Sequence, residues 1–321
     1  MSLLVRIVEN MTTNVSDVTK LVHSELEQNG YKRRVVSIQH INDLKKEIGA
    51  HYNEGVIDKA LYHEYLADFK FEIPAAFPTD SSLIITSAPQ PQYRINFTFK
   101  GRLFQFIIPP QYSHKTDESV EDVLSGVLKP NGFNLRPASL PEKLLAVHSG
   151  LAKYGKNNIS YIEGLGSFYR LRTFYSDLPA IDDSWQELQL MEQCNKCRAC
   201  VNKCPTGAIV QHRFLIQAEK CLTFHNERQA EFPDWIEPSW HNCLIGCMDC
   251  QSVCPANKKL LSWFEEKESF TEEETELILK GTSRHQLPRA TIDKLQRLYL
   301  SDSIIDRMPR NLSVLIEQYS T

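Results

Sequence analysis

The chain has 321 residues, 42% hydrophobic and 24% charged, which is typical of a globular protein large enough for two domains. Its formal net charge of −4 excludes an overall basic field that would draw it onto nucleic acid, although a local basic patch is compatible with this value. No uninterrupted apolar run approaches the roughly 18 residues of a membrane helix, so we expect no membrane partner.

The first half of the chain alternates helical and strand patterns. Val18, Val22 and Leu26 recur at near-helical spacing and predict an amphipathic helix over residues 16–28. The run 82–86 is apolar and stands between prolines, which is typical of a buried strand. We also expect a strand at 34–39, a helix at 42–50, a hairpin at 97–106 turning at Lys100-Gly101, and helices at 117–128 and 142–149. Together these elements predict an α/β layer built on a sheet.

Residues 149–180 are rich in glycine, asparagine and aromatic residues and show weak periodicity. We expect a loop segment here. Such loops often carry function, although the glycines are equally compatible with ordinary turns. Arg170 and Arg172 interleave with Tyr169 and Tyr175, a pattern that suits either a phosphate-bearing or aromatic partner or a solvated surface.

All nine cysteines lie between residues 194 and 254. The first string, CNKCRACVNKCP, has the spacing Cys-x2-Cys-x2-Cys-x3-Cys-Pro, which is the pattern of bacterial ferredoxins that hold iron–sulfur clusters. In two-cluster ferredoxins the fourth cysteine of such a run binds the other cluster. The second string, CMDCQSVCP, repeats the pattern with one cysteine fewer, and Cys221 between the strings offers the missing ligand.

The spacing therefore predicts two 4Fe–4S clusters with crossed ligands. The first cluster would be held by Cys194, Cys197, Cys200 and Cys254, and the second by Cys204, Cys221, Cys247 and Cys250. Cys243 is left over, and it is either a packing residue or a substitute for Cys221.

Other uses of these cysteines fit the pattern less well. Structural zinc sites use Cys-x2-Cys pairs, and three cysteines at successive x2 spacings before Cys-Pro are unusual for them. A disulfide scaffold is typical of a short secreted chain, whereas this chain is long and has an odd cysteine count. Residues 1–10 carry only a short apolar run, interrupted by Arg6 and Glu9, so we expect no signal peptide and a cytoplasmic protein.

Beyond Cys254 the sequence predicts helices. A capping box at Thr271 and Glu274 starts one of them, and residues 289–300 and 311–318 continue in the same style. The expected fold class is α+β. We expect three parts: a sheet domain at 1–180, a two-cluster ferredoxin-like domain at 181–258, and a C-terminal helical segment at 259–321.

Two clusters with interleaved ligands form an electron relay, since Cys200 and Cys204 are close in sequence yet serve different clusters. A relay needs an acceptor, and a second cofactor in the sheet domain is the simplest one. No G-x-G-x-x-G fingerprint follows a predicted strand, and no G-x-x-x-x-G-K-[ST] sequence occurs, so dinucleotide and P-loop sites lack support. The residues alone do not identify the acceptor.

One longer stretch resembles a known family. The sequence LPEKLLAVHSGLAKYGKNNISYIEGLGSFYRLRTFYSDLP, followed by CNKCRACVNKCPTGAIV, AEKCLTF and GCMDCQSVCPANK, is similar to the epoxyqueuosine reductases from about Glu142 to Asn257. The resemblance implies a nitroreductase-like α/β domain that binds cobalamin and receives electrons from two 4Fe–4S clusters. It also implies removal of the epoxide oxygen from a modified tRNA base. The cluster ligands it implies are the eight cysteines named above.

The resemblance further implies where cobalamin would be contacted. A Gly- and Lys-containing stretch lies beside the corrin ring in that family. The corresponding residues in this sequence are Lys153, Gly155, Lys156, Asn157 and Asn158.

The same resemblance exposes a departure at the proton donor. The family has an acidic donor six residues before the position of Glu142, where this chain has Arg136. An arginine is a poor acid because it stays charged, although it could hold an anionic substrate. Substitute donors would be Tyr154, Tyr175 or Glu142.

Three functions remain open at this point. The first is a corrinoid-dependent reductase that receives electrons from a low-potential donor of the ferredoxin or flavodoxin type and acts on tRNA or a small molecule. The second is an electron-transfer or activator protein that docks a corrinoid protein or reductase and binds no corrinoid itself. The third is a flavin-using oxidoreductase on the same scaffold.

Overall fold

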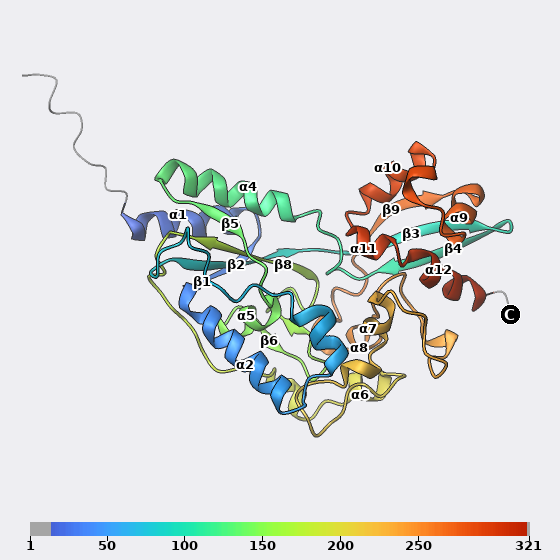
Figure 1. The fold of residues 1–321 in the computed structure, drawn as a ribbon, viewed down its shortest axis with the longest axis horizontal. Helices are drawn as coiled ribbons and strands as arrows, with labels where there is room; N and C mark the ends of the chain where they lie inside the picture. The colour runs from blue at the N-terminus through green and yellow to red at the C-terminus, as the bar shows by residue number, and fades with distance from the viewer. Residues whose placement is uncertain (1–13, 320–321) are drawn as a thin grey trace, which may run out of the picture.

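The computed structural model describes residues 14–319, so the segment 1–10, where no signal peptide is expected, lies outside the described residues. A four-stranded antiparallel sheet in the order β1-β2-β8-β5 crosses the middle of the larger part of the molecule (Figure 1). Its strands are β1 (Lys32–Ser37), β2 (Ser82–Pro89), β8 (Tyr169–Ser176) and β5 (Leu135–Pro137).

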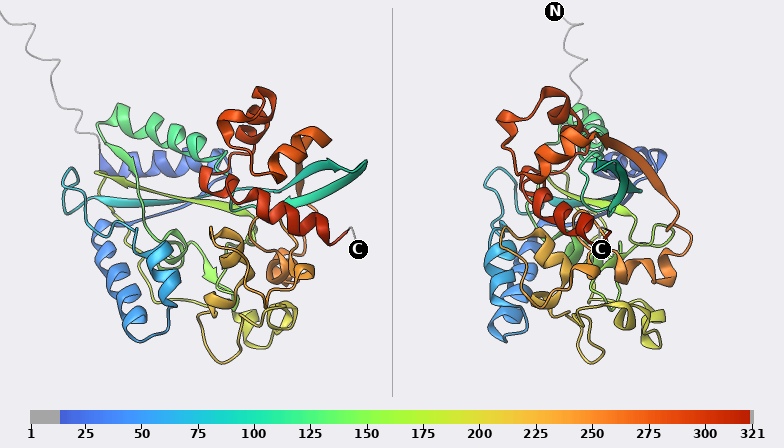
Figure 2. Two further views of the ribbon diagram at one scale, coloured as in Figure 1. Left: turned by 45° about the vertical axis from the view of Figure 1, so that its right-hand side comes forward. Right: turned by 90° about the vertical axis from the view of Figure 1, so that its right-hand side faces the viewer.

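Helices cover both faces of this sheet. The helices α1 (Val15–Gln28) and α4 (Asp117–Leu128) lie together on one face, and α2 (Ile41–Asn53) and α5 (Glu142–His148) lie on the other (Figures 1 and 2). Ile84 of β2 packs with α1 and α4, whereas Leu83 and Ile85 pack with α2 and α5, because successive side chains of a strand point to opposite faces. A strand covered on both faces carries apolar residues in succession, which explains Leu83, Ile84 and Ile85 within the run at 82–86.

A second sheet, in the order β4-β3-β9, lies beyond the end of the first. The predicted hairpin forms two of its strands, β3 (Gln92–Phe99) and β4 (Arg102–Ile108), and its two turn residues both have positive φ. The third strand, β9 (Phe264–Phe270), pairs in parallel with β3, and Phe97 stacks on Phe270 with ring centroids 5.0 Å apart. The helices beside this sheet are α9 (Glu272–Leu279), α10 (Arg289–Arg297), α11 (Asp302–Ile305) and α12 (Met308–Glu317).

The cysteine-bearing region lies below both sheets in Figure 1 and has little regular structure. Its short elements are β6 (Lys153–Tyr154), β7 (Ser160–Tyr161), α6 (Ala199–Lys203), α7 (Leu222–Glu227) and α8 (Asp249–Ser252). Helix α6 lies at the lower, outer end of the molecule in Figures 1 and 2. A helical turn α3 (Lys59–Leu61) leads into a π-helical turn (Tyr62–Leu66) that follows α2.

Two strands lie where the sequence predicted other structure. Segment 149–180, expected to be a loop, contains the central strand β8. The sequence does not look like a buried strand because it contains Arg170 and Arg172. In the structure these arginines occupy partly buried positions, where Asp117 of α4 pairs with them. Strand β9 lies in the part expected to be helical. Its sequence FEEKESF is mostly charged, and its conformation depends on long-range pairing with β3, which local sequence does not reveal.

The α+β class is confirmed, and helix α4 has the predicted bounds. The first predicted strand lies two residues earlier than expected, at Lys32–Ser37. The three-part division of the chain stays a prediction, since β3 and β9 fall in different parts of it and share one core. Among residues 14–319, no helix is long and apolar enough to cross a membrane.

Candidate metal centre and adjoining cavity

The eight cysteines of the crossed assignment lie in two groups. A small hollow is lined by Cys194, Cys197, Cys200 and Cys254, and a larger cavity is lined by Cys204, Cys221, Cys247 and Cys250. All eight are partly exposed free thiols. Within the part of the chain that the structure describes, no three or more His, Cys, Asp or Glu side chains surround a point that could hold a single metal ion.

Two short helices produce this crossing. Cys200 lies in α6 and Cys250 lies in α8, and the two helices pack against each other. Cys204 and Cys254 follow these helices, and each precedes a proline, which cannot continue a helix. The last cysteine of each string thus leaves its own helix and faces the other group.

Asn157 stands between the two groups, since it borders both the hollow and the cavity. Its buried Nδ2 donates hydrogen bonds to the Tyr161 hydroxyl at 2.9 Å and to the Cys250 carbonyl oxygen at 3.5 Å. Burial, followed by the charge of the neighbouring Cys254 sulfur, raises the pKa of Tyr161. Asn157 therefore connects the loop after β6 to both groups of thiols.

The surroundings of several of these thiols, Cys200 and Cys247 among them, favour the protonated form until a metal binds. Burial is the main cause that raises the pKa of Cys200 to about 11 and the pKa of Cys247 to about 12. Asn242 Nδ2 donates a hydrogen bond to Cys247 Sγ at 3.3 Å, and the Thr206 hydroxyl lies 3.4 Å from Cys204 Sγ. Metal binding releases such protons, and hydrogen bonds to sulfur help to set a cluster's reduction potential.

Cys243 has a different environment. Its side chain is 1% exposed and packs with Phe168 and Met248, and its thiol donates a hydrogen bond to Asn242 Oδ1 at 3.1 Å. This is the environment of a packing cysteine.

The cavity beside the second group of cysteines adjoins a wider one. Their volumes are about 340 and 550 Å³, within the usual range for ligand sites, and both are lined mainly by apolar atoms. The residues that border both are Glu142, Lys143, Asn158, Ile216, Cys221, Thr223 and Glu227. Cys221 thus places the second group directly beside the wider cavity.

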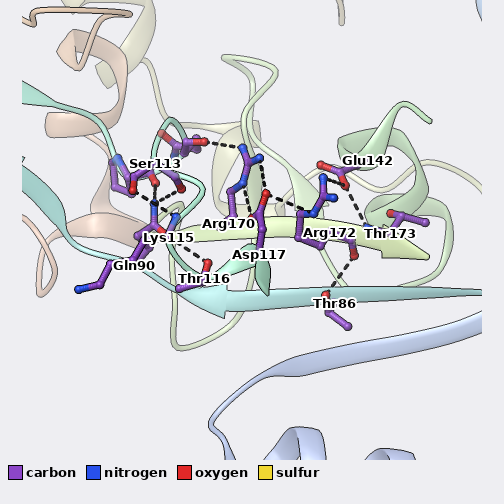
Figure 3. A network of polar contacts seen from close by, with 12 residues as sticks. Thr86, Gln90, Ser113, Lys115, Thr116, Asp117, Glu142, Arg170, Arg172 and Thr173 are labelled. Atoms are coloured by element: carbon purple, nitrogen blue, oxygen red, sulfur yellow. Dashed lines mark hydrogen bonds and ion pairs between the residues drawn. The ribbon is translucent and has the colours of Figure 1, made fainter. Parts of the chain in front are cut away.

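Glu142 begins helix α5 at this shared wall. The backbone N–H of Thr173 donates a hydrogen bond to Glu142 Oε1 at 3.0 Å, and Arg172 Nη1 lies 3.9 Å from the same oxygen (Figure 3). The side chain keeps 23% of its surface exposed, toward the cavity. Removal from bulk water is the largest effect and raises the pKa of Glu142 to about 7, although Arg170 and Arg172 favour the ionised form.

The arginines of β8 are held internally by a carboxylate. Arg170 donates from Nε and Nη2 to the two oxygens of Asp117, each at 3.0 Å, and Arg172 Nε lies 3.3 Å from Asp117 Oδ2 (Figure 3). Paired hydrogen bonds of this kind fix both partners in place. The structure therefore uses these arginines to join β8 to α4.

Two charged residues at the shared wall were not anticipated from the sequence. The Lys143 side chain is exposed at the cavity wall, and its ammonium has no hydrogen bond or ion pair among residues 14–319. Partial loss of solvent around the ammonium lowers the pKa of Lys143, and the charge of Glu227 opposes this change. Glu227 accepts a short hydrogen bond from the Tyr112 hydroxyl, and burial raises the pKa of Glu227. The available signal was that Lys143 lies in the first turn of a predicted helix and that Glu227 follows Cys221 closely.

The predicted corrinoid contacts are spread along the thiol region. Lys153 is exposed on β6, Gly155 and Lys156 line the small hollow, and Asn157 borders both groups. Of the five, Asn158 alone reaches the wider cavity. Its Nδ2 donates to the Phe214 carbonyl oxygen at 2.9 Å, and its Oδ1 accepts from the Ile216 N–H at 2.6 Å.

The residues considered as proton donors lie in three different places. Arg136 is exposed on β5, opposite Tyr175 of β8. The Tyr175 hydroxyl is buried and has no hydrogen-bond partner in the described chain. Tyr154 lines the wider cavity, and burial raises its pKa. Glu142 is the candidate that borders both cavities.

Comparison with known proteins shows two similarities in sequence. Residues 193–257 match the family described as a 4Fe-4S double cluster binding domain. Epoxyqueuosine reductase from Yersinia pestis is 35% identical over 131 residues, which are 39% of this chain and 31% of the relative. The enzyme of the same name from Cyclobacterium marinum is 36% identical over 122 residues, 38% of each chain. The chain thus matches about a third of the length of these curated relatives.

Solved structures extend the similarity in fold. Epoxyqueuosine reductase from Bacillus subtilis has a TM-score of 0.67 at 18% identity, and the alignment covers 95% of this chain and 82% of that one. The enzyme from Streptococcus thermophilus has the same TM-score and coverage at 15% identity. A further structure of such a reductase, with a TM-score of 0.67 and 18% identity over 95% of this chain and 82% of that one, contains an epoxyqueuosine-modified tRNA-Tyr stem loop.

The resemblance noted in the sequence is therefore confirmed: the chain contains a double 4Fe–4S cluster binding domain and is similar to the epoxyqueuosine reductases, in sequence over about two fifths of its length and in fold over nearly all of it.

Proposed function

We propose that this protein is an iron–sulfur reductase that passes electrons through two 4Fe–4S clusters to a corrinoid. The observation that carries the proposal is the arrangement of eight cysteines as two groups of four, with the second group bordering a large cavity. The matching double-cluster family supports the type of metal cofactor. Interleaved ligands would keep the clusters close enough for a relay.

We assign one cluster to each of the two groups of cysteines. Cys194, Cys197, Cys200 and Cys254 would hold the first cluster, and Cys204, Cys221, Cys247 and Cys250 the second. The apolar surroundings of Cys243 support a packing role for that residue. We propose the same three parts of the chain as before, 1–180, 181–258 and 259–321, with the hairpin of the first part docked on the third.

The residues around the two cavities fit a large cofactor with an apolar body and polar edge groups. Leu144 and Phe214 supply apolar surface, and the unpaired Lys143 ammonium and the Asn158 side chain supply polar contacts. A bound cobalamin would supply a cobalt centre that accepts single electrons. We retain Asn157 and Asn158 as its contacts, since Gly155 and Lys156 line the hollow of the first group and Lys153 lines none of the three hollows.

Reductive loss of oxygen needs a proton as well as electrons. We propose Glu142 as the proton donor, because its carboxyl group borders both cavities and is held by the Thr173 N–H and by Arg172. With a pKa near 7, this group is partly protonated at neutral pH, as a general acid should be. Arg136 is exposed and permanently charged, so it does not serve this role.

The first substrate to test is epoxyqueuosine in tRNA, which the names of the relatives and one tRNA-bound structure suggest. A small molecule with a similarly reducible carbon–oxygen bond is the second. The reaction would need a low-potential donor of the ferredoxin or flavodoxin type. Free thiols that hold labile clusters are best preserved in the reducing cytoplasm, where we place the protein.

The proposal is tested by reconstitution under anaerobic conditions. Protein loaded with iron and sulfide, mixed with cob(II)alamin and separated from free cofactor by gel filtration, should retain about eight irons and one corrin. Reduced protein should then convert an epoxyqueuosine-bearing tRNA-Tyr stem loop to a product lighter by one oxygen in mass spectrometry. Iron at half this level would contradict the two-cluster assignment.

Retention of full iron without corrin would favour the second function, an electron-transfer or activator protein for a partner. The observation that supports this second function is the exposed Arg136 at the position where a proton donor is expected. A reduced protein that binds no corrin but rapidly reduces an added corrinoid protein would establish it.

A further inference from the structure

The first group of cysteines lies at the outer surface of the molecule. Helix α6, which carries Cys200, is at the end farthest from α4 and α10 in Figures 1 and 2. The hollow lined by this group shares Asn157 with the cavity of the second group and has no lining residue in common with the wider cavity. Among the described residues, the first group is thus the more distant from the cavity where a reaction would occur.

The second group has the opposite position. Cys221 borders both cavities, and Cys250 lies in α8, behind α6. If both clusters are present, as the proposed function holds, the second one would deliver electrons to the cavity. The first cluster would then be the one that receives them from outside.

Basic residues surround this outer group. Lys196 and Arg198 flank Cys197 and are exposed, and their side chains have no ion pair or hydrogen bond among residues 14–319. Lys203 at the end of α6 lies 3.3 Å from Asp249 and keeps 51% of its side-chain surface exposed. The stretch 193–204 contains these three basic residues and no acidic one.

Nearby charges reduce this basic surface only in part. Lys153 on β6 is a further exposed cation, and Lys156 lines the hollow while it donates to the Gln211 carbonyl oxygen at 3.1 Å. The opposing acidic residues are Glu192, which precedes the stretch, and Asp249, which Lys203 already neutralises. This local excess of positive charge contrasts with the net charge of −4 of the whole chain.

We propose that this surface, defined by Lys196, Arg198 and Lys203, docks an acidic electron-transfer protein that carries a one-electron cofactor. The inference rests on the proposed function for the presence of the clusters. One electron passes from the reduced partner to the oxidised first cluster, so the partner is oxidised, the cluster is reduced, and no bond forms or breaks. Such encounters use small, charged interfaces, and complementary charge speeds association more than it strengthens the complex.

The test measures cluster reduction before any reaction on substrate. Reconstituted protein is mixed in a stopped-flow instrument with a reduced acidic flavodoxin, and the loss of cluster absorbance is followed at several salt concentrations. Replacing Lys196 and Arg198 by glutamate should slow the second-order reduction about tenfold or more at low salt, and replacement by glutamine should slow it less. The difference should shrink as salt rises, because salt screens exposed charges.

The matched control changes two exposed lysines on the other side of the molecule, Lys129 after α4 and Lys280 after α9, to glutamate. This variant has the same net charge as the Lys196→Glu/Arg198→Glu variant and should react nearly as fast as the wild type. If both double variants slow equally, net charge and not this surface is responsible, and the proposal is overturned. Equal rates for the Lys196→Glu/Arg198→Glu variant and the wild type would also overturn it.

A second reductant separates this proposal from the proposed function. Dithionite is a small anion that needs no protein docking surface, so it should reduce the wild type and all three variants to the same extent. Iron analysis and the electron paramagnetic resonance spectra of the reduced proteins show whether changes beside Cys197 disturbed the cluster. If dithionite finds no clusters in the wild type, the proposed function fails. If dithionite reduces the clusters normally and the rate of reduction by flavodoxin does not depend on the charge changes, only the proposed docking surface is disproved.

Discussion

The two groups of cysteines arise from nearly the same sequence pattern but lie in different surroundings. The first is at the surface, beside Lys196 and Arg198, and its hollow has no carboxylate in its lining. The second lies beside two adjoining cavities and close to Glu142 and Glu227. A repeated cysteine motif thus lies in two different settings, and in our proposal the first group would receive electrons and the second would deliver them.

This difference depends on segments far apart in the sequence. The cavity beside the second group is walled by α5, α7 and the loop after β6, whereas the outer group is formed by one short stretch and Cys254. The same cysteine spacing would be compatible with either role. The asymmetry between the groups is therefore the feature to test.

The largest expected effect comes from removing a ligand of the second group. Cys221→Ser should lose the second cluster, so that bound iron falls to about half and turnover is abolished, because a 4Fe–4S cluster needs four thiolates. Iron analysis and spectra of the reduced protein measure the loss. Cys243→Ala is the matched control, since this buried thiol packs against Phe168 and Met248 and should leave both clusters in place. Normal iron in Cys221→Ser together with iron loss in Cys243→Ala would reverse the ligand assignment.

The next effect concerns chemistry at the cavity. Glu142→Gln keeps an oxygen that can accept the hydrogen bond from Thr173 but removes the transferable proton. We expect turnover of the tRNA stem loop to fall about 10²- to 10⁴-fold, while iron content and cluster reduction by dithionite stay normal. The wild-type rate should be highest below pH 7 and decline above it, because the acid must be protonated and its pKa is about 7. A variant with an unchanged rate and pH profile would exclude Glu142 as the donor.

The same carboxyl group should affect stability with a definite sign. Its pKa is raised from the ordinary value of 4.5 to about 7, so the unfolded chain releases this proton first as pH rises. The native state therefore loses stability between pH 4.5 and 7, by about 3 kcal/mol at most. Urea unfolding at pH 5 and pH 8 measures this, and Glu142→Gln should show a smaller difference between the two pH values than the wild type.

The sequence predicts the short-range features of this site but few of the features that depend on residues far apart in the chain. Cysteine spacing and the prolines after Cys204 and Cys254 are short-range features, and the eight cysteines line two separate hollows, while their assignment as cluster ligands stays a prediction. Helix α4 has the predicted bounds 117–128, and its Val120, Leu124 and Leu128 form one buried stripe. Such patterns can be recognised in the sequence because the hydrophobic periodicity of a helix or strand depends only on the residues within that element.

Features that depend on distant partners were not predicted. Strand β8 was missed because Arg170 and Arg172 look solvent-exposed until Asp117 of α4 is placed beside them. The cavity wall was missed for the same reason, since Lys143 and Glu227 come together only in the folded chain. Long-range pairing also sets the register of β9, whose charged sequence gives no strand signal of its own.

A smaller effect should follow from a change where the sheet domain contacts the cysteine region. Gly166 has a φ of +53°, and a Cβ atom there would collide with Asn257 Oδ1 and lie 3.0 Å from the Ala256 carbonyl oxygen. Asn257 is buried and accepts a hydrogen bond from the Ser167 N–H at 2.9 Å. Gly166→Ala should cost about 1–3 kcal/mol in urea unfolding, because the residue is strained and its neighbour must move.

The control for this strain is a glycine with space around it. Gly164 also has a positive φ, of +80°, but no atom lies within 4 Å of a Cβ built there. Gly164→Ala therefore reports the backbone cost alone, and the difference between the two variants reports the contact with Asn257. Equal costs would show that this contact does not hold the cysteine region against the sheet domain.

The smallest effect is expected at Arg136. Its side chain is exposed on the short edge strand β5, opposite Tyr175, and it has no ion pair or hydrogen bond among residues 14–319. Arg136→Ala should change stability by no more than about 0.5 kcal/mol and leave iron content and dithionite reduction unchanged. Turnover at saturating tRNA should also be unchanged, because proton delivery is assigned to Glu142. A rise in KM at constant kcat would instead show that this exposed cation binds the anionic substrate, which would extend the functional surface from the cavities to the edge of the sheet.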